Sequence, residues 1–451
     1  MRVGAAAVFH RLPTTVPLHT LLIMASTSGN TRTRLIFLYF GPLTVLIYLL
    51  APERLLDIPT SYMLKNQLHA TAAQVSSFRV LTGIPIYLGF VFGVTRDLWS
   101  PMNLRDRGFL MLFPSLTAII LVVMALGHVT YTSLLIGMTA VMISFQFIIA
   151  AYQGLIALIG QEALMSGRLS ALWNIFSYLP LSAAAFAAGF ITEHMTPRET
   201  FLIVAAPTLL ISLFGLWKPR AVFLHTYDST LARGSDLLGD IKRLLRHRAI
   251  FPALLINFLW YFTPGVQTAL QYHLTEHLHA ADSIYADYYG IYIVSFLPTF
   301  LLYGFLCTRV PHRTLLWWST LIAVPAIIPL AFIHSGDQAL LLAIPMGLMG
   351  GLASAAYYDL AMRSCPAGLQ GTFMMLTVGI YVLSLRGSDL LGSWIYANSS
   401  VHGFLYCVIA TTATTALILS VIPLIPKQLT ATADGESDSL LEAAILSEAG
   451  A

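Results

Sequence analysis

Several charged side chains interrupt the long apolar runs of this sequence, and five of them could bind a solute or carry a proton. Arg54 and Asp57 lie in the first run, Arg79 in the second, and Arg386 and Asp389 in the run before the last. Guanidinium groups can bind the carboxylate or another anionic group of a small solute, and a carboxylate can exchange a proton. We therefore predict that the three arginines bind an anionic solute and that one of the two aspartates carries a proton.

The same spacing also has a purely structural interpretation. Arg54 and Asp57, and likewise Arg386 and Asp389, are three positions apart, which places each pair on one face of a helix. Such pairs could simply neutralise charges whose burial at bilayer depth costs about 2.5–3.5 kcal/mol each. Asp359 and Arg363, four apart, are predicted to form a structural ion pair of this kind rather than a gate. For the first two pairs, both interpretations stay open.

Aromatic and amide side chains within the apolar runs form a second set of candidates. An aromatic ring can stack on a planar solute, and an amide can hydrogen-bond its edge. The aromatic candidates are Trp260, Tyr261, Tyr357 and Tyr358, with Gln267 and Gln271 as hydrogen bonders, and Gln146 and Gln153 are weaker candidates. Aromatic residues in membrane helices also serve as packing or as interfacial belts, so this alternative is kept beside the binding role.

One short motif suggests metal chemistry. His273, Glu276 and His277 match the pattern H-x-x-E-H of some zinc enzymes, which needs a third metal ligand elsewhere. Because this run ends an apolar segment, we favour ordinary packing and expect no metal. The stretch 234–242 is not a phosphate-binding loop, since its lysine does not directly follow the last glycine. We expect no cofactor, and we expect energy to come from an ion gradient or from the solute's own gradient.

The composition identifies the medium around these residues. Of 451 residues, 57% are hydrophobic and only 10% charged, whereas soluble domains carry about 25% charged residues. The mean hydropathy is +0.76. Too little charge is present to cover a core of this size in water, so lipid must surround most of the chain. The net charge is +3, and the sequence contains no basic patch of the kind typical of nucleic-acid-binding proteins.

The apolar runs are continuous and about twenty residues long, which favours membrane-spanning helices over a β-barrel. Six precede a polar stretch and six follow it. The predicted runs are Leu35 to Leu64, Val75 to Val94, Gly108 to Leu126, Ser133 to Ile159, Leu172 to Ile191, Phe201 to Trp217, Phe251 to Leu270, Tyr288 to Leu306, Leu315 to Ile333, Ala339 to Met362, Phe373 to Ile395 and Phe404 to Ile425.

The charges of the loops support this count. Arg and Lys gather on one side of the predicted membrane, in the N-terminal segment, the loops at 95–107 and 168, the stretch 218–248 and the later loops at 309–313, 363 and 427. Only Lys65 and Arg198 fall on the other side. The positive-inside rule then places both chain ends and the central linker in the cytoplasm of a multi-pass protein of the cell membrane.

These observations divide the chain into five parts. Residues 1–34 are predicted to be an N-terminal cytoplasmic tail, or an upstream extension if Met24 is the true start. Residues 35–217 form the first six-helix bundle, 218–248 a cytoplasmic linker and 249–426 the second six-helix bundle. Residues 427–451 are predicted to be an acidic, solvated tail that includes Asp434.

The loop after the second run carries a recognisable motif. From Gly89 to Gly108 it reads GFVFGVTRDLWSPMNLRDRG, with an acid and a basic cluster beside a glycine-bearing helix end. It resembles the gating loop of the major facilitator superfamily, which implies gating roles for Gly93, Asp97, Arg105 and Arg107. An ordinary basic cytoplasmic loop is the alternative interpretation.

Three further stretches resemble one family of that superfamily, the folate-biopterin transporters. They are the first helix pair from Pro52 to Asp97, the segment NFLWYFTPGVQTALQYHLTEHL from Asn257 to Leu278, and RSCPAGLQGTFMML from Arg363 to Leu376. One departure concerns helix two, where the family has Trp after the proline and then Lys-Pro. This chain has Ile86 after Pro85, and Gly89-Phe90 instead of Lys-Pro.

The resemblance implies an all-α membrane protein of about twelve helices, in two pseudo-symmetric six-helix halves with the major facilitator fold. It implies a secondary active transporter that moves a small organic anion, in this family a folate- or pterin-like solute, by alternating access, coupled to an ion such as the proton. Three alternatives stay open: a facilitator-type exporter of drugs or cell-wall fragments, a membrane receptor or scaffold without transport, and a metalloenzyme using the H-x-x-E-H run.

Overall fold

The computed structural model describes residues 18–223, 246–281, 283–399 and 402–435, together with positions 239, 242 and 244. Throughout these residues the secondary structure is helical, without strands. Ten of the described helices are long and apolar enough to cross a membrane. Together with α8 (Ser166–His194) and the discontinuous segment 250–277, they make twelve crossings, which confirms the predicted fold class.

The first half contains the helices of six crossings, several of them divided. In chain order they are α1 (Leu18–Leu49), α2 (Pro52–Leu55), α3 (Asp57–Tyr62) and the π-helix η2 (Met63–Gln67), then α4 (Ala72–Tyr87), α5 (Gly89–Leu98), η3 (Pro101–Asn103), α6 (Asp106–Leu126), α7 (Tyr131–Glu162), α8 and α9 (Pro197–Leu216). The short α10 (Arg220–Phe223) follows in the predicted linker, most of which lies outside the described residues.

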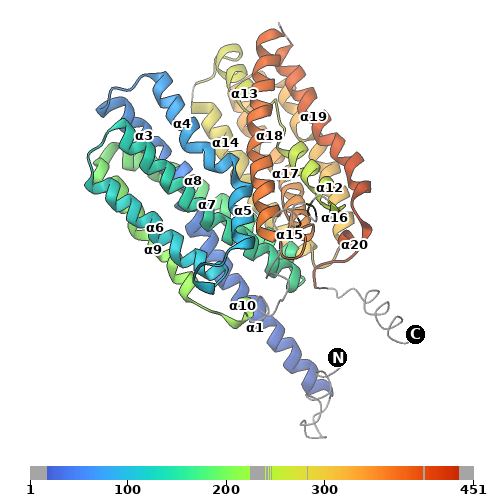
Figure 1. Cartoon of the computed structure of the whole chain (residues 1–451). Helices are drawn as coiled ribbons and strands as arrows, with labels where there is room; N and C mark the ends of the chain where they lie inside the picture. Colours follow the sequence, from blue (N-terminus) through green and yellow to red (C-terminus); the bar gives the residue numbers. More distant parts are fainter. Residues whose placement is uncertain are drawn as a thin grey trace.

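The second half repeats this plan. Its elements are α12 (Ile250–Tyr261), α13 (Thr268–Tyr272), the π-helix η5 (His273–His277), α14 (Ser283–Ser295), α15 (Leu297–Leu306), α16 (His312–Ala323), η6 (Val324–Phe332), α17 (Gly336–Arg363), α18 (Gln370–Asn398), α19 (Gly403–Val421), η7 (Ile422–Leu424) and α20 (Lys427–Thr430). Because the number of crossings is even, the membrane span of α1 starts on the face where α19 ends (Figure 1). We call this the terminal face.

Proline divides the first membrane crossing. The run from Leu35 to Leu64, predicted as a single helix, consists of α1, α2, α3 and η2. Pro52 is the first residue of α2 and Pro59 lies in the first turn of α3, positions where the missing amide hydrogen of proline removes no hydrogen bond from the short helix. The break brings Glu53, Arg54 and Asp57 onto short helical turns in the half of the crossing away from its start in α1.

An internal sequence repeat accounts for the matching ends of the first and seventh crossings. The motif Tyr-x-Leu-x-x-x-Leu-His-Ala occurs at 62–70 and again at 272–280. Both copies form a π-turn, and in both the alanine amide donates to the carbonyl of the first leucine at 2.9 Å. Each histidine takes a positive φ, 50° at His69 and 49° at His279, which only a specific local structure imposes on a non-glycine residue. This duplication supports two related halves.

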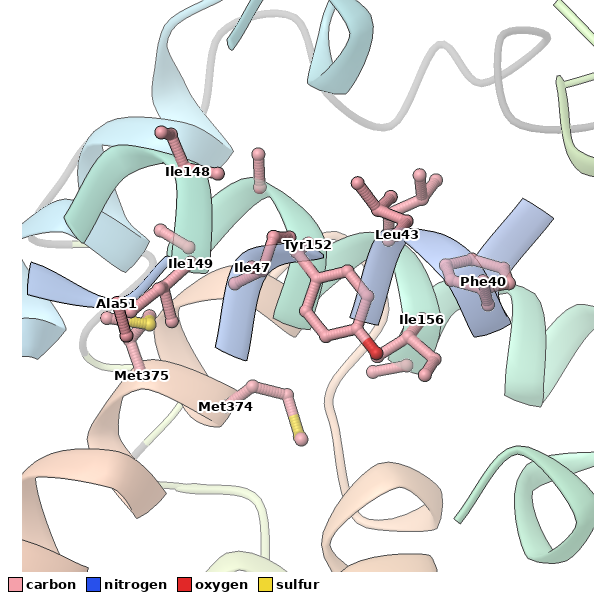
Figure 2. Packing of buried hydrophobic residues seen from close by; sticks show 14 of the residues in the cluster. Phe40, Leu43, Ile47, Ala51, Ile148, Ile149, Tyr152, Ile156, Met374 and Met375 are labelled. Atoms are coloured by element: carbon pink, nitrogen blue, oxygen red, sulfur yellow. The ribbon is translucent and has the colours of Figure 1, made fainter. Parts of the chain in front are cut away.

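Apolar side chains cover the outside of the bundle as well as its core. Val123 is 65% exposed, Leu341 69% and Leu390 75%, as expected for a surface that faces hydrocarbon. In the interior, side chains of α1 and α7 meet around the fully buried Tyr152, with Met374 of α18 nearby (Figure 2). The Tyr152 hydroxyl lies 2.5 Å from that of Thr44, so these two buried hydroxyl groups satisfy each other.

The two ends of the chain differ from the sequence-based description. Helical conformation begins at Leu18, inside the segment 1–34 predicted to be a tail, although the apolar span itself begins at Thr31. At the other end, Asp434 was predicted to be solvated, and this was wrong: its side chain is only 1% exposed. It is buried because it finds hydrogen-bond donors on two helices, which no pattern in the tail sequence indicates. Residues 436–451 lie outside the described residues.

Candidate transport site

Four side chains form a polar and aromatic cluster at the contact between the two halves. We call Tyr48, Gln153, Trp173 and Tyr358 the central cluster; they come from α1, α7, α8 and α17. The Tyr48 hydroxyl accepts hydrogen bonds from Gln153 Nε2 at 3.1 Å and from Trp173 Nε1 at 3.0 Å. The rings of Trp173 and Tyr358 stack with centroids 3.9 Å apart and planes 5° from parallel. The Tyr358 hydroxyl donates to Gln153, so the hydrogen-bonded group joins both halves.

Two charged residues at the helix break lie next to this cluster. The Arg54 guanidinium carbon is 5.7 Å from the centroid of the Tyr48 ring, within the range of a cation–π contact. The neighbouring Glu53 has its Oε2 atom buried without a hydrogen-bond partner. A buried carboxylate oxygen of this kind needs a donor, either a proton or a group on a bound solute. An arginine, an acid and stacked aromatic rings therefore meet beside one another at the interface.

Asp57 does not pair with Arg54, as the alternative interpretation had suggested, but with Arg79 of α4. Arg79 Nε and one terminal nitrogen reach the two carboxylate oxygens at 3.0 and 2.9 Å. The Arg79 and Asp57 side chains are 51% and 41% exposed. The pair joins the first and second crossings, and its exposure limits its contribution to stability to about 1 kcal/mol or less.

Arg386 and Asp389 also have separate positions. Asp389 Oδ1 accepts a hydrogen bond at 3.1 Å from the amide of Thr268, the first residue of α13. This carboxylate therefore caps a helix that begins in the middle of the seventh crossing, where the amide would otherwise have no partner. Arg386 is an exposed residue of α18.

The aromatic candidates of the second half pack in pairs. The ring centroid of Trp260 lies 5.2 Å from that of Tyr357, whose hydroxyl is 2.6 Å from Thr320 Oγ1 and which is only 5% exposed. Tyr261 packs edge-on against Tyr381 at 4.5 Å. Gln267 is the residue before α13, next to the amide that Asp389 caps. Trp260, Tyr261 and Gln267 belong to the seventh crossing, and Tyr357 packs against it. None of these four residues is part of the central cluster.

Asp97 of the predicted gating loop joins the two halves at the terminal face. Its carboxylate accepts hydrogen bonds from the amides of Gly371 at 3.1 Å and Thr372 at 2.6 Å, and from the Thr372 hydroxyl at 2.7 Å. These amides belong to the first turn of α18, where unpaired N–H groups and the helix dipole favour an anion. Asp97 therefore caps a helix of the opposite half.

Arg96 and Gly93 complete this contact. Arg96 donates to both oxygens of Asp106 at 2.6 Å and to Asp97 at 2.7 Å, and all three side chains are at most 8% exposed. Gly93 lies so close to α18 that an added Cβ atom would be 2.4 Å from the carbonyl oxygen of Gly371. Only glycine permits this approach of the two helices. The sequence motif located Gly93 and Asp97, whereas Arg96 had been counted only as a loop charge.

The two other arginines of the loop take different positions. Arg107 donates to the carbonyl oxygens of Gly215 at 3.0 Å and Leu216 at 3.2 Å, at the C-terminal end of α9, where a cation complements the helix dipole. Arg105 is the N-cap residue of α6 and has a φ of 49°, and its amide donates to Ser100 Oγ at 2.8 Å. The contacts of Arg107 hold α6 and α9 of the first half together.

The H-x-x-E-H run has a structural explanation. It forms the π-turn η5, the counterpart of residues 63–67 in the first half, and the His273 ring lies flat on that of Phe404 with centroids 4.2 Å apart. Of the four residues in the central cluster, Tyr48 and Trp173 were not identified as candidates from the sequence. Both lie in long apolar runs where an aromatic residue is ordinary, and only the fold shows that they meet Gln153 and Tyr358.

Comparison with curated proteins finds relatives that transport folates or pterins. The chain is 23% identical over 398 residues to a folate-biopterin transporter of Synechocystis sp. (strain ATCC 27184 / PCC 6803 / Kazusa), covering 82% of this chain and 78% of that protein. It is 20% identical over 292 residues to folate transporter 1 of Plasmodium falciparum (isolate 3D7), covering 62% of this chain and 55% of the relative.

Solved structures show the same fold. FucP, a Major Facilitator Superfamily transporter in the outward conformation, matches with a TM-score of 0.62 at 17% identity, over 86% of this chain and 98% of that one. A bacterial homologue of the iron transporter ferroportin in an outward-facing state matches with a TM-score of 0.62 at 14% identity, over 86% and 98%. The human organic anion transporter MFSD10 (TETRAN) matches with 0.58 at 16% identity, over 88% and 99%.

The family model of the Major Facilitator Superfamily matches residues 37–385, which include most of both helical halves. Both copies of the repeated turn, and the contact between Asp97 and the first turn of α18, lie within the matched residues. The chain is a multi-pass membrane protein and belongs to the major facilitator superfamily of transporters.

Proposed function

We propose that this protein is a secondary active transporter for a small organic anion with a flat ring, of the folate or pterin class. The observation that carries the proposal is the stacked Trp173–Tyr358 pair at the contact between the halves, with ring centroids 3.9 Å apart, together with Arg54 over the Tyr48 ring of the same cluster. Stacked rings suit a planar heterocycle and a guanidinium suits a carboxylate. The names of the two curated relatives support the same solute class.

The distribution of contacts supports alternating access. On the terminal side of the central cluster, Ser170 Oγ donates to the Ala355 carbonyl at 2.6 Å and Gln161 Nε2 donates to that of Cys365 at 2.8 Å. With the cap of Asp97 on α18, these bonds hold the halves together on that face. We propose that the terminal face is cytoplasmic and closed here, and that breaking these bonds opens the site to the cytoplasm.

For coupling, the proposal includes a proton and three candidate carriers. Asp57 and Asp389 were predicted from the sequence, and Glu53 joins them because its Oε2 atom is buried without a partner. Asp57 already has an arginine and Asp389 already caps α13. Glu53 is therefore our preferred carrier, next to Arg54. Arg79, Arg386, Trp260, Tyr261, Gln267 and Tyr357 remain proposed contributors to the solute path.

Uptake of tritiated folic acid and biopterin into proteoliposomes tests this function directly. We expect accumulation of at least one of them, inhibited by the unlabelled compound. Replacing Trp173 by alanine removes a stacking surface worth about 1–3 kcal/mol for a heterocycle and should weaken half-saturation about 5- to 150-fold. Trp173→Phe keeps a ring and should retain most of the affinity.

The same measurement separates the alternatives. Equal uptake by Trp173→Ala and wild type would show that the central cluster does not bind the solute. If proteoliposomes with correctly folded protein accumulate neither compound, a screen of thermal stability against sugars, peptides and drugs is the next step, because a bound ligand raises the unfolding temperature by mass action.

A further inference from the structure

A buried carboxylate in the C-terminal tail caps a helix of the first half. Asp434 follows α20, and its two oxygens accept hydrogen bonds from the amide of Gly167 at 3.2 Å and from that of Arg168 at 2.9 Å. These amides belong to the first turn of α8, which has no side-chain cap of its own. The tail therefore satisfies donors at a helix N-terminus that lies more than two hundred positions earlier in the chain.

Backbone hydrogen bonds fix the same stretch of tail to both halves. The amide of Asp434 donates to the carbonyl of Cys307, just after α15, at 2.8 Å. The next amide, that of Gly435, donates to the carbonyl of Leu164, just before α8, at 2.8 Å. Two consecutive residues thus bridge the second half and the first half at the terminal face.

Arginine supplies the counter-charge. A terminal nitrogen of Arg363 lies 2.8 Å from Asp434 Oδ1, and its Nε lies 2.8 Å from Asp359 Oδ1 within α17. Asp359 also receives the Tyr303 hydroxyl at 2.7 Å and lies 3.1 Å from His312 Nδ1. The pair of Asp359 and Arg363, predicted as structural, is therefore part of a larger buried network that the tail completes.

The contact has the same design as that of Asp97. Asp97 of the first half caps α18 and is held by Arg96; Asp434 caps α8 and is held by Arg363. Both helices are the fifth crossing of their half, so the two caps are related by the pseudo-symmetry. The difference is origin: in the second half the carboxylate comes from the tail beyond the last crossing, and not from the loop after α15.

We propose that residues 432–435 form a tail latch, which closes the terminal face by capping α8 across the interface and must release before that face opens. The proposal rests on the alternating access proposed above. The latch acts as the partner of the Asp97 contact, so closure of this face requires both. The tail thereby regulates the equilibrium between the two open states of the transporter.

A native cysteine reports on the latch. The Cys307 thiol is buried, its sulfur is 3.9 Å from Asp434 Oδ2, and burial raises the pKa of this thiol well above its usual range. Because the thiolate is the reactive form, labelling by N-ethylmaleimide should be slow while the tail is bound. The rate is measured at pH 7.5 on the full chain in nanodiscs, where both faces are accessible, and mass spectrometry of peptides resolves each cysteine.

Asp434→Ala should raise the rate of labelling at Cys307 about tenfold, the ratio that corresponds to about 1.4 kcal/mol for the lost contacts. Deleting residues 431–451 should raise it at least as much, whereas deleting only 437–451 leaves every contact described above in place and should change nothing. Cys407 is buried near the start of α19, at the opposite end of the last crossing from the latch, so it controls for general unfolding, and its rate should stay constant.

Equal labelling of Cys307 in Asp434→Ala and wild type would overturn the latch, and so would an increase produced by the 437–451 deletion alone. Parallel increases at Cys307 and Cys407 would show loss of folding instead of release of the tail, and would also count against the proposal. The labelling needs no solute, so its outcome is independent of whether folic acid or biopterin is transported.

Discussion

Replacing Gly93 by alanine is expected to lower uptake about tenfold or more by preventing closure of the terminal face. An added Cβ atom would lie 2.4 Å from the carbonyl oxygen of Gly371 and 2.8 Å from the Cα atom of Thr372. Both are backbone atoms of α18 that cannot move aside independently. Overpacking of this kind costs about 1–3 kcal/mol, and that cost falls on the closed state alone. The equilibrium ratio of closed to open molecules should therefore fall about 5- to 150-fold.

A matched control is available in the same crossing. At Gly83 of α4 an added Cβ atom would meet only the ring of Tyr87, at the ordinary contact distance of 3.5 Å. Both substitutions gain the same helix propensity, about 1 kcal/mol, so a difference between them isolates the approach of the two halves. Gly83→Ala should transport like wild type.

The conformational effect is read separately from transport. Cys365 lies buried beside the contact, with its carbonyl bound to Gln161, and burial raises the pKa of its thiol well above the usual value. In Gly93→Ala we expect faster labelling of this cysteine, because opening the face exposes and ionises the thiol. Unchanged labelling together with unchanged uptake would show that this close approach is not needed for closure.

A second variant, Gly371→Ala, tests whether the effect comes from the distance between the two helices and not from a local defect at Gly93. At Gly371, on the other side of the contact, an added Cβ atom would be 2.6 Å from Arg96 Cδ and 2.8 Å from Asp97 Oδ1. Gly371→Ala should therefore resemble Gly93→Ala in both measurements. A loss of uptake in only one of the two variants would contradict an explanation based on the distance between the helices.

The sequence was sufficient to predict the twelve crossings and the two halves, because burial in lipid leaves a strong signal. Long apolar runs follow from the cost of exposing backbone and charge to hydrocarbon, and the concentration of basic residues in alternate loops follows the positive-inside rule. Gly93 and Asp97 were located for a related reason: a loop that must bring two helices together needs a small residue and an anion at fixed spacing.

The central cluster could not be predicted in the same way. Tyr48 and Trp173 are apolar-looking residues in apolar runs, and their roles follow from neighbours more than a hundred positions away. Asp434 is the opposite case, since an acid in an acidic tail indicates solvent. Its burial depends on free amides at the start of α8 and on Arg363, and neither is visible from the tail sequence.

Replacing Glu53 by glutamine is expected to abolish accumulation driven by a proton gradient while preserving exchange of solute. If one proton crosses with one solute molecule, a gradient of one pH unit stores about 1.4 kcal/mol and supports about tenfold accumulation. Glutamine keeps the size and the hydrogen-bonding capacity of the side chain but cannot release a proton. Uptake by Glu53→Gln should therefore stop at equal concentrations inside and outside.

Asp57→Asn is the matched comparison, because both acids lie on short turns of the same divided crossing. The Asp57 carboxylate already binds Arg79 through both oxygens, whereas Glu53 Oε2 has no partner, so only the latter has an oxygen free to take a proton or a solute donor. Accumulation and exchange are measured in proteoliposomes with and without an imposed pH gradient. Tenfold accumulation by Glu53→Gln would exclude Glu53 as the proton carrier, and loss of accumulation in Asp57→Asn alone would assign the proton to Asp57.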